Sequence, residues 1–420
     1  MPTGFRAARI ASRGMTNTVV HGLPRWSLAV PPLALVVLVL TWGRDLGAVL
    51  IVLVCLGLGA AVIAAVHHAE VVAHRVGEPF GTLILALAVT VIEVALIVTL
   101  MASGGDKAAS LARDTVFAAV MITCNGIVGL ALVVGSVRHT TQQFRVHASG
   151  SALAVMTALV TLSLVLPTFT TSTPGATFSP AQLAFAGVAS LAMYGVFVFV
   201  QTIRHRDYFL PVAAEETAAV GVGTVAGASA GAGQDGAAAG AGSEAEKVSI
   251  AADLVDDEED GEVHAAAPTG RVAVLSLSLL FVCLIAVVGL AKTVSPKLED
   301  AVESAGAPVA VVGVVIALLV LLPETVAAVR AALRNRLQTS LNLALGSALA
   351  SIGLTIPAIA VASIWLSGPL VLGLGGTEMV LFALTVIVSM LTLATGRATL
   401  LQGAVHLMIF SSFVFLAVSP

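Results

Sequence analysis

Charged residues are scarce in this sequence. Only 10% of the 420 residues are Asp, Glu, Lys or Arg, and 58% are hydrophobic, whereas a soluble domain carries about 25% charged residues. A water-soluble globular fold is therefore excluded, and we expect an all-α chain that crosses a lipid bilayer many times. Nothing resembles a basic nucleic-acid-binding surface, so no nucleic-acid partner is expected.

Cysteines and nucleotide-binding motifs are also few or absent. The three cysteines, Cys55, Cys124 and Cys283, all fall in apolar stretches, which favours a role as small packing residues over a disulfide framework. The phosphate-binding pattern GxxxxGK[ST] does not occur. We therefore expect no cofactor, and a transporter of this kind would draw its energy from an ion gradient.

Apolar stretches long enough to cross a membrane dominate what is present. A span needs about 20 apolar residues, and the sequence predicts about 11 transmembrane helices. The predicted spans are Trp26–Trp42, Leu46–Val66, Pro79–Ala102, Thr115–Val137, Ala148–Phe169, Ala181–Ile203, Arg271–Ala291, Pro308–Val329, Ser340–Leu366, Thr377–Thr395 and Ala398–Val418.

The basic residues between these spans predict the topology. With a cytoplasmic N-terminus, 15 of the 20 Lys and Arg residues fall on the cytoplasmic side and five fall outside, as the positive-inside rule requires. The basic N-terminal segment MPTGFRAARIASRG is then an uncleaved cytoplasmic tail. The composition, rich in Ala, Val and Gly, favours a bacterial plasma (inner) membrane.

A low-complexity segment divides the chain. Residues 204–270 contain a Gly/Ala-rich run followed by the acidic run AADLVDDEEDGEVH, which predicts a flexible acidic cytoplasmic linker. We therefore expect five parts: a tail (1–25), an extra first helix (26–45), a five-helix repeat (46–203), the linker (204–270) and a second five-helix repeat (271–420). Because five is odd, the two repeats would be inverted relative to each other.

Weak internal similarity supports the two repeats. The stretch that starts at Leu337 resembles the stretch that starts at Arg113. Thr115 then matches Thr339, and Gly129 matches Gly353, at a common offset of 224 residues. The spans just before them each contain one glutamate. This pairing predicts that the two glutamates occupy corresponding positions of the two repeats.

Those two glutamates, Glu93 and Glu324, are the main candidates for function. Each lies well within a long apolar span, and no Lys or Arg lies in the interior of any predicted span. A carboxyl group at this depth must be protonated, bind a cation, or do both in turn, and intramembrane carboxylates usually mark an ion or proton pathway. The alternative is a buried interhelical hydrogen bond without a transport role.

Two carboxylates from two repeats suit one Ca²⁺ ion, a hard cation that takes six to eight oxygen ligands. We expect Glu93 and Glu324 to bind the transported Ca²⁺ and the protons. Pro323 and Gly346 are predicted to interrupt their helices and free backbone carbonyls. Further oxygens would come from Thr123, Asn125, Ser347, Ser351 and Thr355.

The segment HHAEVVAHRVGEP, which precedes the third span, has two interpretations. His67, Glu70 and His74 would share one helical face, with Glu78 close behind. We interpret the segment as an amphipathic turn at the cytoplasmic membrane edge. The alternative is a role in regulation or in proton access to the site.

Three motifs resemble the bacterial ChaA branch of the calcium/cation antiporter superfamily: HHAEVVAHRVGEPFGTLILALAVTVIEVALI, RDTVFAAVMITCNGIVGLALVVG and LPETVAAVRAALRNRLQTSLNLALGSALASIGLTIPA. The resemblance implies an extra first helix, two inverted repeats and an acidic segment between them. It also implies that Glu93 and Glu324 exchange a cation for protons. Related exchangers carry a Gly-Asn pair shortly before each glutamate, and this chain does not, so the resemblance leaves the ion selectivity open.

We therefore predict a secondary active transporter that exchanges cytoplasmic Ca²⁺ for protons by alternating access. The main alternative is a Na⁺ or K⁺/proton antiporter of the same family. A passive cation channel and an intramembrane enzyme are alternatives from other classes, although the spans contain no nucleophile and base pair. The expected partners are inorganic cations, protons and the lipid bilayer, and the oligomeric state stays open.

Overall fold

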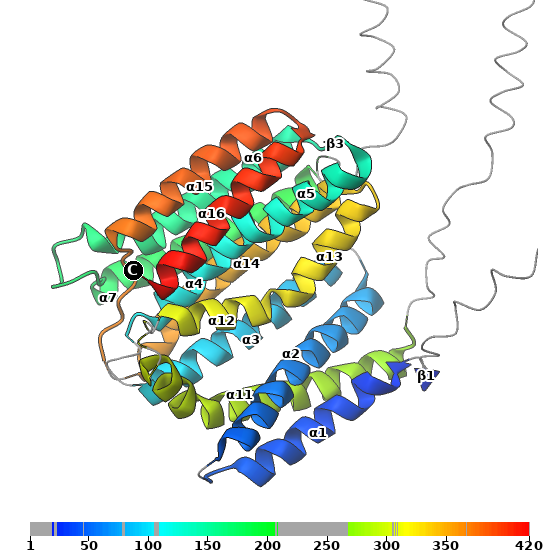
Figure 1. Cartoon of the computed structure of the whole chain (residues 1–420), viewed down its shortest axis with the longest axis vertical. Helices are drawn as coiled ribbons and strands as arrows, with labels where there is room; N and C mark the ends of the chain where they lie inside the picture. Colours follow the sequence, from blue (N-terminus) through cyan, green and yellow to red (C-terminus); the bar gives the residue numbers. More distant parts are fainter. Residues whose placement is uncertain are drawn as a thin grey trace, which may run out of the picture. The chain divides into compact units, whose positions relative to one another are not determined.

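The computed structural model describes residues 19–20, 23–44, 46–77, 80–104, 109–205, 208, 268–304, 306, 308, 310–366 and 368–419 (Figure 1). Most of the N-terminal tail and nearly all of the predicted linker lie outside these residues. The described residues are almost entirely helical, with two short antiparallel strand pairs. β1 (Val19–Val20) pairs with β2 (Leu23–Pro24), and β3 (Gln142–Gln143) pairs with β4 (Arg397–Ala398).

The first half of the chain contains seven α-helices among its described residues: α1 (Arg25–Thr41), α2 (Ala48–Val76), α3 (Phe80–Gly104), α4 (Leu111–Met121), α5 (Val128–His139), α6 (Val146–Val160) and α7 (Pro180–Phe199). The π-helical segment η2 (Ile122–Ile127) joins α4 to α5 without a break. The π-helical segments η3 (Thr161–Val165) and η5 (Val200–Arg204) and the 3₁₀ turn η4 (Leu166–Thr168) extend α6 and α7.

The second half begins with α11 (Gly270–Ser304) and continues with α12 (Ala310–Val320), α13 (Leu322–Leu333), α14 (Leu337–Ala362), α15 (Gly376–Ala394) and α16 (Leu400–Val418). In the part of the chain that the structure describes, nine helical spans are long and apolar enough to cross a membrane. The pair α12–α13 forms a tenth, bent by 52°, and the shorter α1 is an eleventh apolar helix. Each predicted span thus coincides with a helix or with consecutive helical segments.

Two helices are much longer than predicted. α2 continues ten residues beyond Val66, to Val76, and α11 continues beyond Ala291, through Pro296, to Ser304. The segment with His67, Glu70 and His74 is therefore the last part of a 29-residue helix and not a separate amphipathic turn. The sequence explains this extension, because no Gly or Pro occurs between Gly59 and Gly77, and Gly77 ends the helix with a positive φ of 79°.

The helix packing has the reciprocal pattern expected of inverted repeats. The first helices of the two halves, α2 and α11, pack along each other and against α1. The central helix of the second half, α14, packs on α3 and α7 of the first half. The central α4–η2–α5 unit of the first half packs on α12 and α16 of the second half. These two central helices are also the most buried spans, so the fold places them at the centre of the transmembrane unit.

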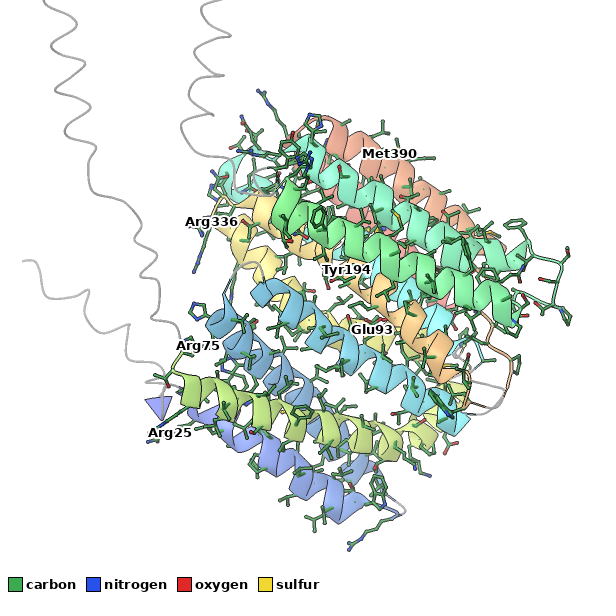
Figure 2. The ribbon with its side chains drawn as sticks, turned by 180° about the vertical axis from the view of Figure 1, so that it is seen from behind. Arg25, Arg75, Glu93, Tyr194, Arg336 and Met390 are labelled. Atoms are coloured by element: carbon green, nitrogen blue, oxygen red, sulfur yellow. The ribbon has the colours of Figure 1, made fainter. Side chains whose placement is uncertain are left out.

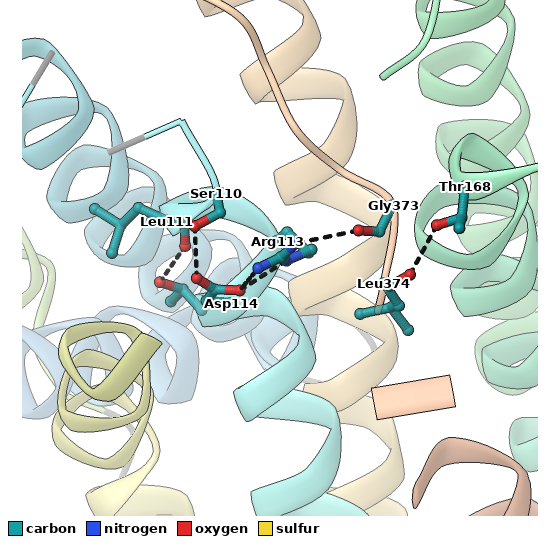
Figure 3. A network of polar contacts seen from close by, with 8 residues as sticks. Ser110, Leu111, Arg113, Asp114, Thr168, Gly373 and Leu374 are labelled. Carbon is teal, nitrogen blue, oxygen red and sulfur yellow. Dashed lines mark hydrogen bonds and ion pairs between the residues drawn. The ribbon is translucent and has the colours of Figure 1, made fainter. Parts of the chain in front are cut away.

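The connections after the two central helices repeat this reciprocity. We call residues 140–145 and 368–375 the capping loops. In the first loop, the Arg145 backbone N–H donates to Oε1 of Gln338, at the start of α14 (2.6 Å). In the second loop, the carbonyl of Gly373 accepts from Nη1 of Arg113, at the start of α4 (3.2 Å), and Arg113 also pairs with Asp114 (Figure 3). Each loop therefore closes the beginning of the other half's central helix.

The capping loops lie at opposite ends of the helices, as the predicted alternation of loops requires. At one end, Gln142 donates to the carbonyl of Ala332 (2.8 Å), which brings the α5–α6 and α13–α14 connections together. Figure 2 shows Arg25, Arg75 and Arg336 along one end of the helices, with Glu93 well inside. Residues predicted to share the cytoplasmic face therefore share one end of the structure. Which end faces the cytoplasm stays a prediction.

Candidate cation site

The first glutamate is held by a hydroxyl group from the opposite repeat. Glu93 lies in the middle of α3 and is only 3% exposed. Oγ of Ser351, on α14, lies 2.7 Å and 2.8 Å from its two carboxylate oxygens. The crossing of α14 over α3 thus places a hydrogen-bond donor at Glu93, as a buried carboxyl group requires.

The second glutamate lies at a helix break. α12 ends at Val320, and α13 begins at Leu322 after the 52° bend. Pro323 occupies the second position of α13 and Glu324 the third. The helix is therefore interrupted beside Pro323, because proline has no backbone N–H to donate to the preceding turn and its ring clashes with the carbonyl four residues earlier. The break places the Glu324 carboxyl at the N-terminus of α13, where the helix dipole favours a negative charge.

Glu324 differs from Glu93 in its hydrogen bonding. Glu324 is 8% exposed, and its Oε2 is buried without a hydrogen-bond partner among the described residues. At the repeat offset of 224, the position that matches Ser351 is Ile127, which has no hydroxyl to donate. α3, which carries Glu93, and α13, which carries Glu324, both pack on α14. Among the described residues, one oxygen of Glu324 is thus left free to accept a proton or a cation.

A row of hydroxyl groups follows one face of α14. Ser347, Ser351 and Thr355 are spaced by four residues, which places them one above the other on a helix. Thr355 is completely buried, and its Oγ1 has no partner within the described part of the chain. The prediction that Gly346 breaks this helix is wrong, because α14 is continuous from Leu337 to Ala362. A glycine in a helix keeps its N–H and carbonyl in the helical ladder, so it does not itself free a backbone oxygen.

Two predicted ligands on the other central helix are directed elsewhere. The Thr123 hydroxyl donates to the carbonyl of Ala119, one turn earlier in its own helix. Asn125 donates from Nδ2 to Oγ1 of Thr385 (2.9 Å), and its Oδ1 lies 3.2 Å from Nδ1 of His406. The role predicted for Asn125 as an ion ligand is therefore replaced here by bonds to α15 and α16. Sequence reasoning missed His406, although a titratable residue in mid-span was a signal for it.

His67 and Glu70 lie near the end of α2, which packs on α3, the helix that carries Glu93. His67 Nδ1 is 3.9 Å from Oε2 of Glu70, and the ring of His67 lies 5.0 Å from that of Trp26. His74 is exposed, and Glu78 lies outside the described residues. Proton access through His67 and Glu70 stays a prediction.

The arrangement is suited to binding a cation weakly and to exchanging it for protons. Within the described ranges, no three His, Cys, Asp or Glu side chains come together as a resident metal centre. Two carboxyl groups, the Ser351 hydroxyl and the Thr355 hydroxyl supply at most six oxygens, and only four if each carboxylate binds through one oxygen, whereas Ca²⁺ takes six to eight. The remaining ligands of a transported ion would have to be water or backbone oxygens.

The chain is similar to known ion transporters over most of its length. The family described as sodium/calcium exchanger protein matches residues 46–203 and 275–419. The chain is 44% identical over 401 residues to y4hA of Sinorhizobium fredii, whose name describes an ionic transporter, covering 95% of this chain and 97% of that protein. It is 34% identical over 392 residues to the sodium-potassium/proton antiporter ChaA of Escherichia coli, covering 92% and 94%.

Solved structures share the fold at low sequence identity. The structure of native YfkE superposes with a TM-score of 0.62 at 16% identity, over 94% of this chain and 99% of that one. The crystal structure of the H⁺/Ca²⁺ exchanger CAX gives a TM-score of 0.61 at 14% identity, over 93% of this chain and 92% of that one. At these identities the likeness concerns the fold, and it agrees with the all-helical, inverted-repeat arrangement described above.

Proposed function

Because the chain belongs to the sodium/calcium exchanger protein family, we propose that it is a secondary active transporter that exchanges cytoplasmic Ca²⁺ for protons. The family makes it a multi-pass membrane cation exchanger. The proposal adds the ion, the coupling to protons, the bacterial inner membrane and the cytoplasmic N-terminus.

The observation that carries the proposal is the pair of buried glutamates, one from each repeat. Glu93 and Glu324 are 3% and 8% exposed. Among the described residues, neither forms an ion pair with a lysine or arginine. Isolated buried carboxylates are costly, so each is neutralised by a proton or by a cation. Two such groups, on helices that both pack on α14, favour one shared cation that displaces their protons.

The proposed cycle follows from this competition. With the site open to the cytoplasm, Ca²⁺ binds to the two carboxylates and their protons leave. With the site open to the outside, protons bind and Ca²⁺ is released. Because both ligands use the same oxygens, lowering the pH raises the apparent KM for the cation, by about tenfold per pH unit for each proton displaced. Sliding of the outer helices against the central helices would expose the site to one side at a time.

The decisive test is ion-coupled proton flux in proteoliposomes that contain an internal pH dye. Wild-type protein is expected to move protons when Ca²⁺ is added, and Glu93→Gln and Glu324→Gln are expected to abolish this flux. Glu378→Gln, at the start of α15, is a control carboxyl substitution and is expected to retain the flux. Undiminished exchange in the Glu93→Gln/Glu324→Gln double variant would overturn the proposal.

A Na⁺ or K⁺/proton antiporter is a second candidate, and one observation favours it. The relative that shares 34% identity over 92% of this chain is named a sodium-potassium/proton antiporter. The same proteoliposomes separate the two candidates when Ca²⁺, Na⁺ and K⁺ are added singly. If Ca²⁺ moves no protons while Na⁺ or K⁺ does, the ion assignment changes and the two-glutamate site stands.

A further inference from the structure

His406 is a completely buried histidine for which the exchange cycle has no role. It lies in the middle of α16 and is 1% exposed. α16 packs closely on α5, so His406 lies against the central helix of the first half. A Cβ atom added to Gly129 would lie 2.9 Å from Cβ of His406, and one added to Gly403 would lie 2.7 Å from the Val133 backbone nitrogen. Only glycine at these positions lets α16 and α5 pack this tightly.

The hydrogen bonds around His406 form one chain in which the direction of each bond follows from the last. The Thr385 hydroxyl donates to the carbonyl of Leu381 (2.7 Å), so it accepts from Nδ2 of Asn125 (2.9 Å). Oδ1 of Asn125 then faces Nδ1 of His406 (3.2 Å), which must carry the hydrogen. Because a charged imidazole buried without a carboxylate partner would be costly, the ring is neutral, Nε2 is the acceptor, and the Thr392 hydroxyl donates to it (3.1 Å). This assignment leaves both nitrogens satisfied.

The chain of bonds holds the π-helical segment η2 in place. Asn125 lies within η2, and π-helical segments are rare and occur frequently at functional sites. η2 contacts α15 and α16 on the side of this network, and it also contacts α13 and α14, which carry Glu324 and Ser351. The matching position in the second half is Leu349, an apolar residue. The network therefore belongs to one repeat only, the one whose central helix contains the π-helical segment.

We propose that His406 is a positioning residue for cation binding: through Asn125 it fixes η2 in its π-helical form behind the Glu324 side of the site. This inference rests on the proposed exchange function. His406 does not carry the transported proton, because both of its nitrogens are already committed in the neutral form and no carboxyl group takes part in the chain of bonds. Its removal should weaken cation binding and leave the proton coupling unchanged.

The test compares His406→Leu with His406→Asn in proteoliposomes, using Ca²⁺ and K⁺ separately as probes. The leucine variant removes the donor to Asn125, and loss of a buried hydrogen bond corresponds to about a tenfold change or more. We expect its apparent KM for the transported cation to rise by about tenfold, with the pH profile of the maximal rate unchanged. The asparagine variant keeps a side-chain nitrogen close to the position of Nδ1, and it should restore most of the affinity.

Milder variants keep the test informative if His406→Leu does not fold. Thr385→Val removes the acceptor of Asn125 at nearly constant volume and should raise the KM in the same direction by a smaller factor. Ser412→Ala is the matched control, because among the described residues the Ser412 hydroxyl bonds to the carbonyl of Met408 in its own helix and to no other group. An unchanged KM in both His406→Leu and Thr385→Val would overturn the inference, and so would a lost proton coupling in His406→Asn. Lack of exchange by the wild-type protein would instead reject the proposed function.

Discussion

At the scale of single residues, the two glutamates occupy corresponding positions but have different environments. Ser351 contacts both carboxylate oxygens of Glu93, whereas one oxygen of Glu324 has no partner within the described part of the chain. The difference follows from the sequence, because Ile127 stands where a repeat-symmetric serine would be. The carboxyl group of Glu93 is thus fixed in orientation, and that of Glu324 is the one more free to change its partner.

Removing the Ser351 hydroxyl should weaken cation binding. Ser351→Ala leaves the buried Glu93 carboxyl without its donor, and a hydrogen bond to a charged group contributes about 1.5–3 kcal/mol, or roughly 10- to 100-fold in affinity. Ser351→Thr keeps the hydroxyl and should retain most of the affinity. The measurement is the apparent KM of cation-driven proton flux. Ser347→Ala, one turn away on α14, should have a smaller effect, and equal KM values for Ser347→Ala and Ser351→Ala would contradict this account.

The residues of the site could be predicted from the sequence to different degrees. Glu93 and Glu324 are exceptional as acidic residues inside apolar spans, so composition alone identifies them. The contact between Ser351 and Glu93 depends on how α14 crosses α3, which no local pattern contains. Asn125 was identified as a polar residue in a span, but its partners on α15 and α16 are 260 and 281 residues away in the chain, so the direction of its side chain could not be predicted.

At the scale of helices, two prolines have opposite consequences. Pro323 accompanies a break between α12 and α13, whereas Pro357 lies inside the continuous α14. The apolar helix α12 ends at Val320, just before Pro323. The backbone hydrogen bonds lost at this break are replaced where α13 begins. The break gives the second half a helix N-terminus at the depth of Glu324.

Replacing Pro323 should change the geometry of the site without lowering the stability of the protein. Pro323→Ala restores a backbone N–H and removes the proline ring, which lets α12 and α13 approach one straight helix and would displace the Glu324 carboxyl. We expect the exchange rate to fall by about tenfold, as for the loss of one charge-assisted contact, without a decrease in the thermal unfolding temperature in detergent. Pro357→Ala is the control, since α14 is already continuous. A parallel loss of exchange and stability in Pro323→Ala would argue against a specific role for the bend.

Hydropathy predicted the positions of the helices because a bilayer requires about 20 apolar residues per span. It could not predict the π-helical segment η2. A π-helical turn differs from an α-helical turn by one residue, and it persists here because tertiary bonds from α15 and α16 hold Asn125. The same limit applies to the long ends of α2 and α11, where hydropathy falls but helical geometry continues.

At the scale of the whole transmembrane unit, the described core has two large clusters of buried apolar side chains and a small third one. One large cluster joins α1, α2 and α11 to parts of α3 and α12, and the other joins α4 to α7 with part of α12 and with α13 to α16. The long helices α2 and α11 contact each other more extensively than they contact the central helices. This arrangement suits a pair of helices that slides as one body along the centre of the molecule.

Cross-linking should distinguish contacts that slide from contacts that do not. A Cβ atom at Gly59 on α2 would lie 3.6 Å from Cδ1 of Leu319 on α12, and one at Gly57 would lie 3.8 Å from Cδ1 of Leu290 on α11. In a background without Cys55, Cys124 and Cys283, a bifunctional thiol reagent should stop exchange in Gly59→Cys/Leu319→Cys. It should leave Gly57→Cys/Leu290→Cys active. Reduction of the cross-link should restore the flux, and continued exchange by the cross-linked Gly59/Leu319 variant would rule out sliding at this contact.

Because of the reciprocal capping loops, each half of the chain depends on the other half. The first turn of α4 is closed by Gly373, and the first turn of α14 is closed by Arg145, so the polar groups at both helix beginnings depend on backbone supplied from across the pseudo-twofold axis. A half-length polypeptide would lack both closures unless a second, inverted copy of the same half supplied them.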